Sequence, residues 1–213
     1  MTERIVCVVE GDGERAAVPL LVRRILGHLR RERRMPIDDE FILVAKSGEK
    51  IVQPYDHVRQ IGIEWYVKRA VAEGPAGVLV IVDAEDRCVS APSGTPALGP
   101  SLLARARAVA GSIPIAVVVA NRMFETWFLA DARSLRHRNV FAGAVRIPSV
   151  AAPESIGGCK GHVSALLGRK YKETSDQVAL ARVVSLPIRR AIRLRSPSFA
   201  RLFDAVDRLS RRT

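Results

Sequence analysis

The fold is decided near the N-terminus by the stretch Arg4-Ile5-Val6-Cys7-Val8-Val9-Glu10-Gly11-Asp12-Gly13-Glu14. Its first part is short, β-branched and almost wholly apolar, which is typical of a strand buried on both faces. A helical pattern follows, with apolar residues on one face and arginines on the other. We expect this helix to start between Glu14 and Ala17, because Pro19 is tolerated only in the first turn of a helix.

Strands and helices alternate along the next hundred residues. The patterns predict further strands at 41–45, 77–82 and 113–120, a loop at 46–55, and helices at 57–73, 101–110 and 124–135. This order predicts an α/β fold: a mainly parallel four-stranded sheet, Rossmann-like, flanked by helices. We assign 1–135 to the core, 136–160 to a linker, and 161–213 to a basic helical extension packed on the core.

The charge of the chain is strongly positive. Among 213 residues there are 34 Lys and Arg against 22 Asp and Glu, a formal net charge of +12. Residues 161–213 contribute 12 basic and 4 acidic side chains to this excess. The excess favours a polyanionic partner, nucleic acid first and an acidic protein second, with simple solubility as the alternative interpretation.

Several classes of protein are excluded by the pattern. The longest apolar runs fall far short of the ~18 residues that a membrane helix needs. No secretory signal is visible, and three scattered cysteines do not form a disulfide framework, so we expect a cytoplasmic protein. The four histidines show no spacing suited to zinc.

Acidic side chains gather at two of the predicted strand ends. The first strand is followed by Glu10, Asp12 and Glu14, and the third by Asp83, Glu85 and Asp86. A parallel sheet places both ends on the same edge, where ligands bind. If the chain stays extended, Asp83 and Glu85 point the same way and face Glu10. Clustered carboxylates repel one another, and a divalent cation relieves that cost.

Two other interpretations of these residues remain open. The acids after the first strand are also compatible with a turn that caps a helix and complements its dipole. Gly11 and Gly13 are reminiscent of a nucleotide-binding loop, which would make the chain a Rossmann-like nucleotide-binding enzyme, but the third glycine of that fingerprint is missing.

These residues resemble a known family. The order of a strand with Glu10, a helix, a strand, a helix, and a strand with Asp83-x-Glu85 is similar to the Toprim domain of topoisomerases, primases and overcoming-lysogenization-defect (OLD) nucleases. The motif Val9-Glu10-Gly11-x-x-Glu14 is most similar to the OLD type. The segments 125–131 and 196–199 resemble a Toprim-like group often encoded near AAA-type ATPases. The usual Asp-x-Asp is Asp83-x-Glu85 here.

The resemblance implies a metal-dependent nuclease or phosphodiester-transfer enzyme. Glu10, Asp83 and Glu85 would hold Mg²⁺ or Mn²⁺, and Glu14 and Asp86 would help with a second ion. The substrate would be nucleic acid, DNA first, and the partner an AAA-type ATPase in defence against phage or mobile elements. The alternative is a catalytically silent subunit that binds nucleic acid or the ATPase.

Later residues extend the candidate site. Glu125 either pairs with Arg122, three residues earlier, or lies beside the metal site together with Asp131. Lys170 and Lys172, around Tyr171, either contact a scissile phosphate or form a solvated basic face. The aromatic segment 127–129 is expected in the core, and Ser196 and Ser198 are expected to start the last helix.

Overall fold

The computed structural model describes residues 4–31, 35–85, 97–143, 153–186 and 195–211. Four strands form one sheet in the order β2-β1-β3-β4, and every neighbouring pair is parallel. The strands are β1 (Ile5–Val9), β2 (Ile37–Val44), β3 (Gly77–Asp83) and β4 (Ile115–Ala120). The predicted α/β class, with a parallel sheet flanked by helices, is confirmed.

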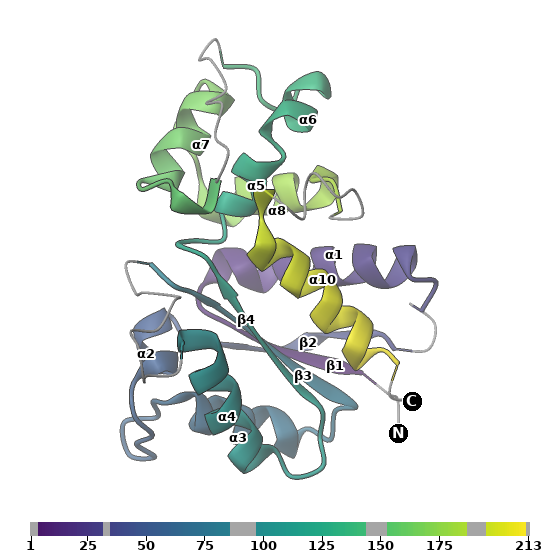
Figure 1. Ribbon diagram of the computed structural model, residues 1–213, viewed down its shortest axis with the longest axis vertical. Coiled ribbons are helices and arrows are strands. Elements are labelled where there is room, and N and C mark those ends of the chain that lie inside the picture. Colours follow the sequence, from purple (N-terminus) through teal and green to yellow (C-terminus); the bar gives the residue numbers. More distant parts are fainter. Residues whose placement is uncertain (1–3, 32–34, 86–96, 144–152, 187–194, 212–213) are drawn as a thin grey trace.

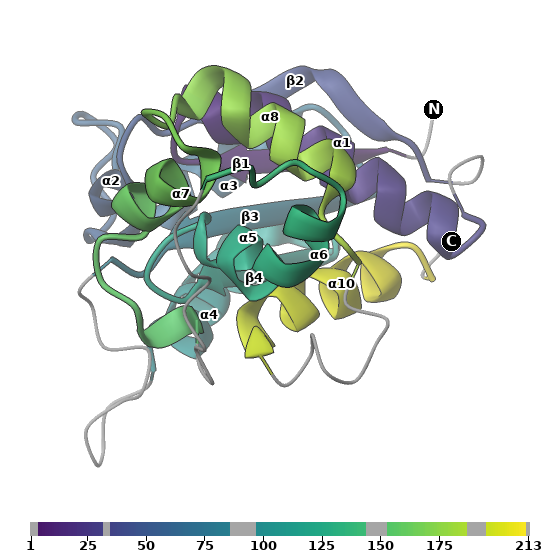
Figure 2. The same cartoon turned by 90° about the horizontal axis from the view of Figure 1, so that it is seen from above.

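Helices cover both faces of the sheet (Figure 1). On one face lie α1 (Asp12–His28), α8 (Glu173–Val183) and α10 (Pro197–Leu209). On the other face lie α2 (Gly48–Val52), α3 (Ile63–Ala72) and α4 (Leu98–Ala110). Figure 2 looks onto the carboxyl end of β4, which is covered by α5 (Thr126–Ala130), α6 (Ala132–His137), the 3₁₀ helix η1 (Pro153–Ser155) and α7 (Cys159–Leu167).

The core is divided by the sheet into two halves. Alternate residues of β1 point to opposite faces, so that Cys7 and Val9 pack towards α1 while Val6 and Val8 pack towards α3. Every residue of β1 and β3 is buried. This two-sided burial explains why both strands read as continuous apolar runs, and each fully buried valine contributes roughly 1.5–3 kcal/mol.

The predicted start of the first helix is wrong. Helix α1 begins at Asp12, directly after the extended Gly11, so that Pro19 lies inside the helix and not in its first turn. A proline at an interior position costs about 3 kcal/mol, because it removes one hydrogen bond and crowds the preceding turn. Packing against β2 and α8 offsets that cost, since Pro19 is itself buried.

Four other predicted segments differ from the observed structure. Residues 57–61 form a turn instead of helix, because Asp56 Oδ1 accepts hydrogen bonds from the N–H groups of Val58 and Arg59. The predicted loop at 46–55 contains α2, and β2 begins at Ile37, before the predicted start. The predicted helix at 124–135 is divided into α5 and α6 at Asp131.

The C-terminal helices pack on the sheet and on α1. Ser196 caps α10 by accepting a hydrogen bond from the Phe199 N–H, and Pro197 is the first residue of this helix, as predicted. Trp127 is fully buried, stacks on Phe199 with ring centroids 5.2 Å apart, and donates from Nε1 to Ser198 Oγ at 2.8 Å. The predicted core position of 127–129 is confirmed. No described helix is long and apolar enough to cross a membrane.

Candidate functional site

Glu10 and Asp83 meet at the carboxyl ends of two neighbouring strands. Glu10 follows β1 directly, and Asp83 is the last residue of β3. Oε1 of Glu10 accepts a hydrogen bond from the Asp83 N–H. The same carboxylate accepts the Gly48 N–H at the start of α2, where any Cβ atom would overlap it. Glycine at position 48 therefore leaves the space that the Glu10 carboxylate fills.

Both carboxyl groups are destabilised in their charged form. Burial raises the pKa of Glu10 to about 7, and the charges of Glu14 and Glu85 act in the same direction. Burial, together with Glu10, Glu125 and Glu14, raises the pKa of Asp83 well above its usual range. The causes are desolvation and like charge, and the backbone hydrogen bonds that each group accepts oppose them only in part.

Glu14 reaches the same place from the first turn of α1. Its Oε1 accepts a hydrogen bond from Gln177 Nε2 of α8 at 3.0 Å. Its other oxygen lies against Gly11, where a Cβ atom would stand only 2.7 Å away. The strand, turn and helix start thus bring the carboxylate of residue 14 back beside that of residue 10.

Glu125, which follows β4, joins this group. Its side chain is 1% exposed, and the Tyr171 hydroxyl lies close enough to its carboxyl group to lower its pKa. Burial raises the pKa of Glu125, and the ammonium group of Lys160 opposes that shift. We call Glu10, Glu14, Asp83 and Glu125 the acidic rim. The charge of Glu125 raises the pKa of Asp83, so Glu125 lies near the end of β3.

Two side chains from the C-terminal part of the chain face the acidic rim. Tyr171 is 7% exposed, and burial followed by the charge of Glu125 raises the pKa of its hydroxyl. Lys160 lies in the first turn of α7, with Nζ 2.7 Å from Glu173 Oε1. Burial lowers the pKa of Lys160, but Glu173, Glu125 and Asp83 outweigh it and raise the pKa overall. Lys160 is therefore a fully charged cation beside the rim.

Lys170 and Lys172 do not face the acidic rim. Both are exposed, whereas Tyr171 between them points inward, because successive residues of an extended segment alternate in direction. The N–H of Lys172 donates to Asp176 Oδ2 at 2.8 Å, which fixes the start of α8. Sequence reasoning missed Lys160, although it lies among three glycines in 157–161, a composition typical of a tight turn before a helix.

Glu85 does not continue the direction of β3. Its φ of 52° is left-handed, its side chain is exposed, and its N–H donates to the Arg122 carbonyl at 2.6 Å. The expectation that Asp83 and Glu85 point the same way is wrong, because the chain turns instead of staying extended. The charge of Glu85 still raises the pKa of Glu10. Asp86 lies outside the described residues.

A pocket of about 400 Å³ opens beside the acidic rim. Glu85, Arg122 and the start of α7 line it. Cys159 contributes to this wall, but burial and the charge of Glu125 raise the pKa of its thiol to about 11, so it is not a nucleophile at neutral pH. The pocket is therefore lined by a cationic side chain, Arg122, whereas the neighbouring rim consists of carboxyl groups.

Two further buried acids have structural roles. Asp131 Oδ2 accepts the Ser185 N–H at 2.7 Å, and this bond fastens the segment after α8 to the start of α6. Glu154, which sequence reasoning missed, is 7% exposed. Its Oε1 accepts hydrogen bonds from Ser196 Oγ at 2.8 Å, and from the Oγ and N–H of Ser198 at 2.6 and 2.8 Å. Glu154 thereby anchors the start of α10.

The acidic rim is not a preformed metal centre. Among the described residues, no group of three His, Cys, Asp or Glu side chains is arranged so that it could hold a metal ion. The rim carboxylates influence one another electrostatically, but Glu10 and Glu14 are engaged by an N–H and an amide of the protein itself.

Comparison with known proteins identifies a family. No curated protein and no solved structure matches the chain. A family model described as a domain of unknown function (DUF4276) matches residues 9–207, a range that contains the whole acidic rim, Lys160 and Tyr171. Since this match spans nearly all of the sequence, the chain belongs to the DUF4276 family.

Proposed function

We propose that the protein is a divalent-metal-dependent phosphodiesterase of the Toprim type, acting on nucleic acid at the acidic rim. The observation that carries the proposal is the crowding of four carboxyl groups from β1, α1, β3 and the segment after β4. Burial first, and like charge second, raise the pKa values of Glu10, Asp83 and Glu125, so keeping these groups charged in this place costs stability at neutral pH. Buried carboxyl groups with strongly shifted pKa values are concentrated at functional sites.

The chemistry of the rim suits a hard cation. Mg²⁺ and Mn²⁺ prefer carboxylate oxygens, and the carboxyl group of Glu125 is deeply buried and close enough to Asp83 to raise the pKa of that residue. Glu10, Asp83 and Glu125 are the residues that would hold the ion, with Glu14 beside them. Glu85, being exposed, would act on the rim through its charge.

Lys160 is the cationic side chain beside the acidic rim that would bind the phosphate of a phosphodiester. When bound, a divalent ion would supply a metal-bound hydroxide and charge compensation for the phosphate. Lys160 would bind a non-bridging phosphate oxygen, because its ammonium stands beside the rim and carries a full charge at neutral pH. The net charge of +12 would attract the remainder of a nucleic-acid backbone.

A cleavage assay tests this proposal. Supercoiled plasmid, single-stranded DNA and RNA are incubated with the protein in EDTA, Mg²⁺ or Mn²⁺. We expect cleavage only with a divalent ion, and a loss of about 100-fold or more in Asp83→Asn and Glu125→Gln, because each loses a metal ligand. Glu73→Gln is the matched control: it removes the same charge from an exposed residue at the end of α3. If the Asp83→Asn variant still cleaves nucleic acid, the assignment of the active site to the acidic rim is refuted.

A second candidate function follows from the absence of a ready metal group among the described residues. In this alternative the protein is a catalytically silent subunit that binds nucleic acid or an ATPase, and the Glu10 carboxylate only fixes the β1, β3 and α2 ends together. Calorimetric titration with Mn²⁺ distinguishes the two. Retained DNA binding without any Mn²⁺ binding would support the silent subunit.

The resemblance to Toprim-like proteins also suggests a partner. We include an AAA-type ATPase in the proposal, acting with this chain against phage or mobile elements. Co-purification from a host that expresses both proteins, with and without ATP, tests that association.

A further inference from the structure

β4 is an edge strand of the sheet formed by the described residues. β4 is hydrogen-bonded only to β3, and no described segment pairs with its outer edge. The carbonyl groups of Pro114 and Ala120 accept hydrogen bonds from the N–H groups of Val78 in β3 and Ala84 directly after it. By the alternation of a strand, Ile115, Val117 and Val119 direct their N–H and C=O groups away from β3, towards the free edge. This edge lies between α4 and α10 in Figure 1.

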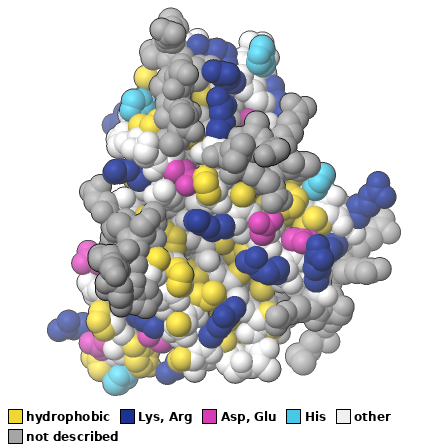
Figure 3. Space-filling model, in the orientation of Figure 1, with side chains coloured by type: hydrophobic (Ala, Val, Ile, Leu, Met, Phe, Trp, Pro, Cys, Tyr) yellow, Lys and Arg dark blue, Asp and Glu magenta, His cyan; other side chains and the backbone are white. Residues whose placement is uncertain are grey.

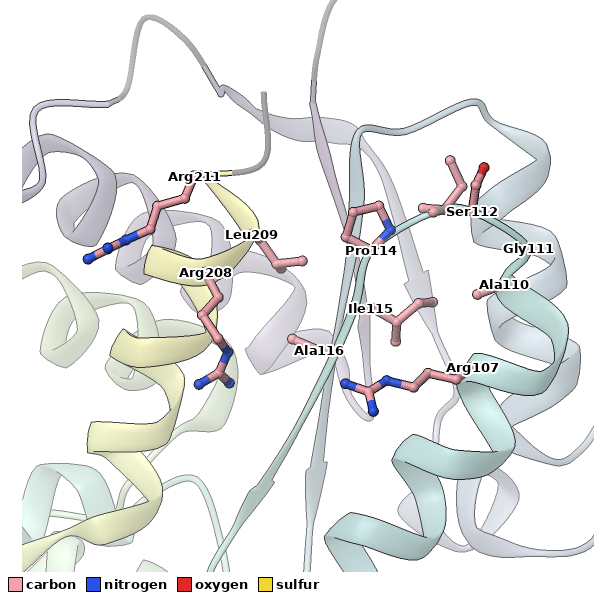
Figure 4. Close-up of a pocket in the computed structure, with 11 residues that line it drawn as sticks. Arg107, Ala110, Gly111, Ser112, Pro114, Ile115, Ala116, Arg208, Leu209 and Arg211 are labelled. Atoms are coloured by element: carbon pink, nitrogen blue, oxygen red, sulfur yellow. The ribbon is translucent and has the colours of Figure 1, made fainter.

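Arginines stand on both sides of the free edge. A pocket of about 480 Å³ at the start of β4 is lined by 114–116, by Arg107 of α4 and by Arg208 of α10. Figure 4 shows the guanidinium groups of Arg107 and Arg208 extending towards Ala116 from opposite sides of β4. Both arginines are exposed, and neither has an ion pair with a described residue. In contrast, Arg211 pairs with Asp207 at 2.6 Å.

A second pocket continues the groove along β4. It measures about 380 Å³ and is lined by Val117 and Val119 of the strand, Leu103 of α4 and Arg201 of α10. Figure 3, in the orientation of Figure 1, shows apolar side chains interspersed with Lys and Arg on this face. We call Arg107, Arg201 and Arg208 the edge arginines. The groove thus combines unpaired backbone groups, apolar walls and positive charge.

We propose that the outer edge of β4 binds an extended acidic segment of a partner protein, which adds to the sheet as a fifth strand. Backbone groups of Ile115, Val117 and Val119 provide the hydrogen bonds of such an addition, and the edge arginines select acidic side chains. The six residues of β4 offer about 20 Å of edge, enough for a segment of similar length. This binding does not depend on the acidic rim.

Charge decides against a second copy of this chain as the occupant. Pairing two β4 edges would bring two sets of edge arginines together, and like charges at such an interface are repulsive. Charge alone does not distinguish an acidic peptide from the phosphate backbone of a nucleic acid. The unpaired N–H and C=O groups favour the peptide, because a phosphate backbone offers no alternating donors to match them.

Fluorescence anisotropy with synthetic peptides tests the proposal. The probe is a labelled eight-residue peptide of alternating glutamate and valine, and the control peptide replaces glutamate with lysine. We expect the acidic peptide to bind and the basic one not to bind. On binding, amide hydrogen exchange should slow at Ile115, Val117 and Val119, whose N–H groups become paired.

Two variants separate backbone pairing from charge. Val117→Pro removes an N–H that points away from β3, so it blocks strand addition without breaking the β3–β4 pairing. The double variant Arg107→Glu/Arg208→Glu removes the charge complementarity. We expect each to weaken peptide binding about tenfold or more. The double variant Arg133→Glu/Arg182→Glu, at exposed positions on α6 and α8, is the charge-matched control and should bind normally.

Two results would overturn the proposal. One is the absence of peptide binding to the unmodified protein. The other is binding that is lost in the arginine variant, retained in Val117→Pro and displaced by a single-stranded oligonucleotide, since that pattern indicates a phosphate-backbone site. If Val117→Pro does not fold, unchanged amide exchange at the three β4 positions in the unmodified protein gives the same negative answer.

Discussion

Replacing Glu10 with glutamine should make the protein more stable at pH 8 and leave its stability nearly unchanged at pH 4.5. The variant keeps the shape of the side chain and an oxygen that accepts the Asp83 N–H. It removes the charge that burial, Glu14 and Glu85 disfavour. Most substitutions of a buried, hydrogen-bonded residue destabilise a protein, so a gain in stability would be specific to the electrostatic argument.

The direction of the effect follows from the two pKa values of Glu10. The pKa rises from 4.5 to about 7 on folding. Between these pH values the folded state binds more protons than the unfolded chain, so stability falls as pH rises, and the whole penalty is present above pH 7. The penalty corresponds to about 3 kcal/mol. Because glutamine accepts weaker hydrogen bonds than a carboxylate, we expect a net gain of about 1–2 kcal/mol at pH 8.

Urea unfolding at pH 4.5 and pH 8 measures the effect. A gain of this size at pH 8 corresponds to a rise of about 3–6 °C in melting temperature for a domain of this length. Glu73→Gln, exposed and far from the rim, should show no such pH-dependent gain. A Glu10→Gln protein that is less stable than the parent at pH 8, or that gains equally at both pH values, would show that the acidic rim carries no electrostatic strain.

Three further outcomes are expected. Lys160→Gln should lower the cleavage rate about tenfold or more in the metal-dependent assay, while its melting temperature stays close to that of the parent because Lys160 is half exposed. Glu154→Ala should cost about 3 kcal/mol in urea unfolding, since three hydrogen bonds at the start of α10, two of them from Ser198, lose their acceptor. Arg105→Lys should cost about 2 kcal/mol in the same measurement, because one ammonium cannot replace the fork that holds Glu64 and two carbonyls of the α2 end.

The parts of the fold that depend on local pattern could be predicted from the sequence. β1 and β3 are continuous apolar runs because both their faces are covered, and that pattern requires a parallel sheet. Parallel strands in turn place Glu10 and Asp83 at one edge. These two residues therefore follow from topology alone.

The remainder of the site depends on contacts between distant segments. Lys160 and Tyr171 reach the acidic rim only because α7 and the segment before α8 fold back over the end of the sheet, and no local pattern shows that. The left-handed turn at Glu85 is fixed by its bond to the Arg122 carbonyl, 37 residues along the chain. Pro19 is similar, because its tolerance depends on tertiary packing and not on the helix itself.

The last helix has a consequence for synthesis of the protein. α10 supplies the stacking partner of Trp127 and places Leu209 against Gly77 at the start of β3. While α10 is still inside the ribosome, the nascent chain has every strand of the sheet but leaves the part of the apolar face over β3 and β4 without its helix. Native packing against this face is therefore completed only after α10 has been translated, and until then that apolar surface remains exposed.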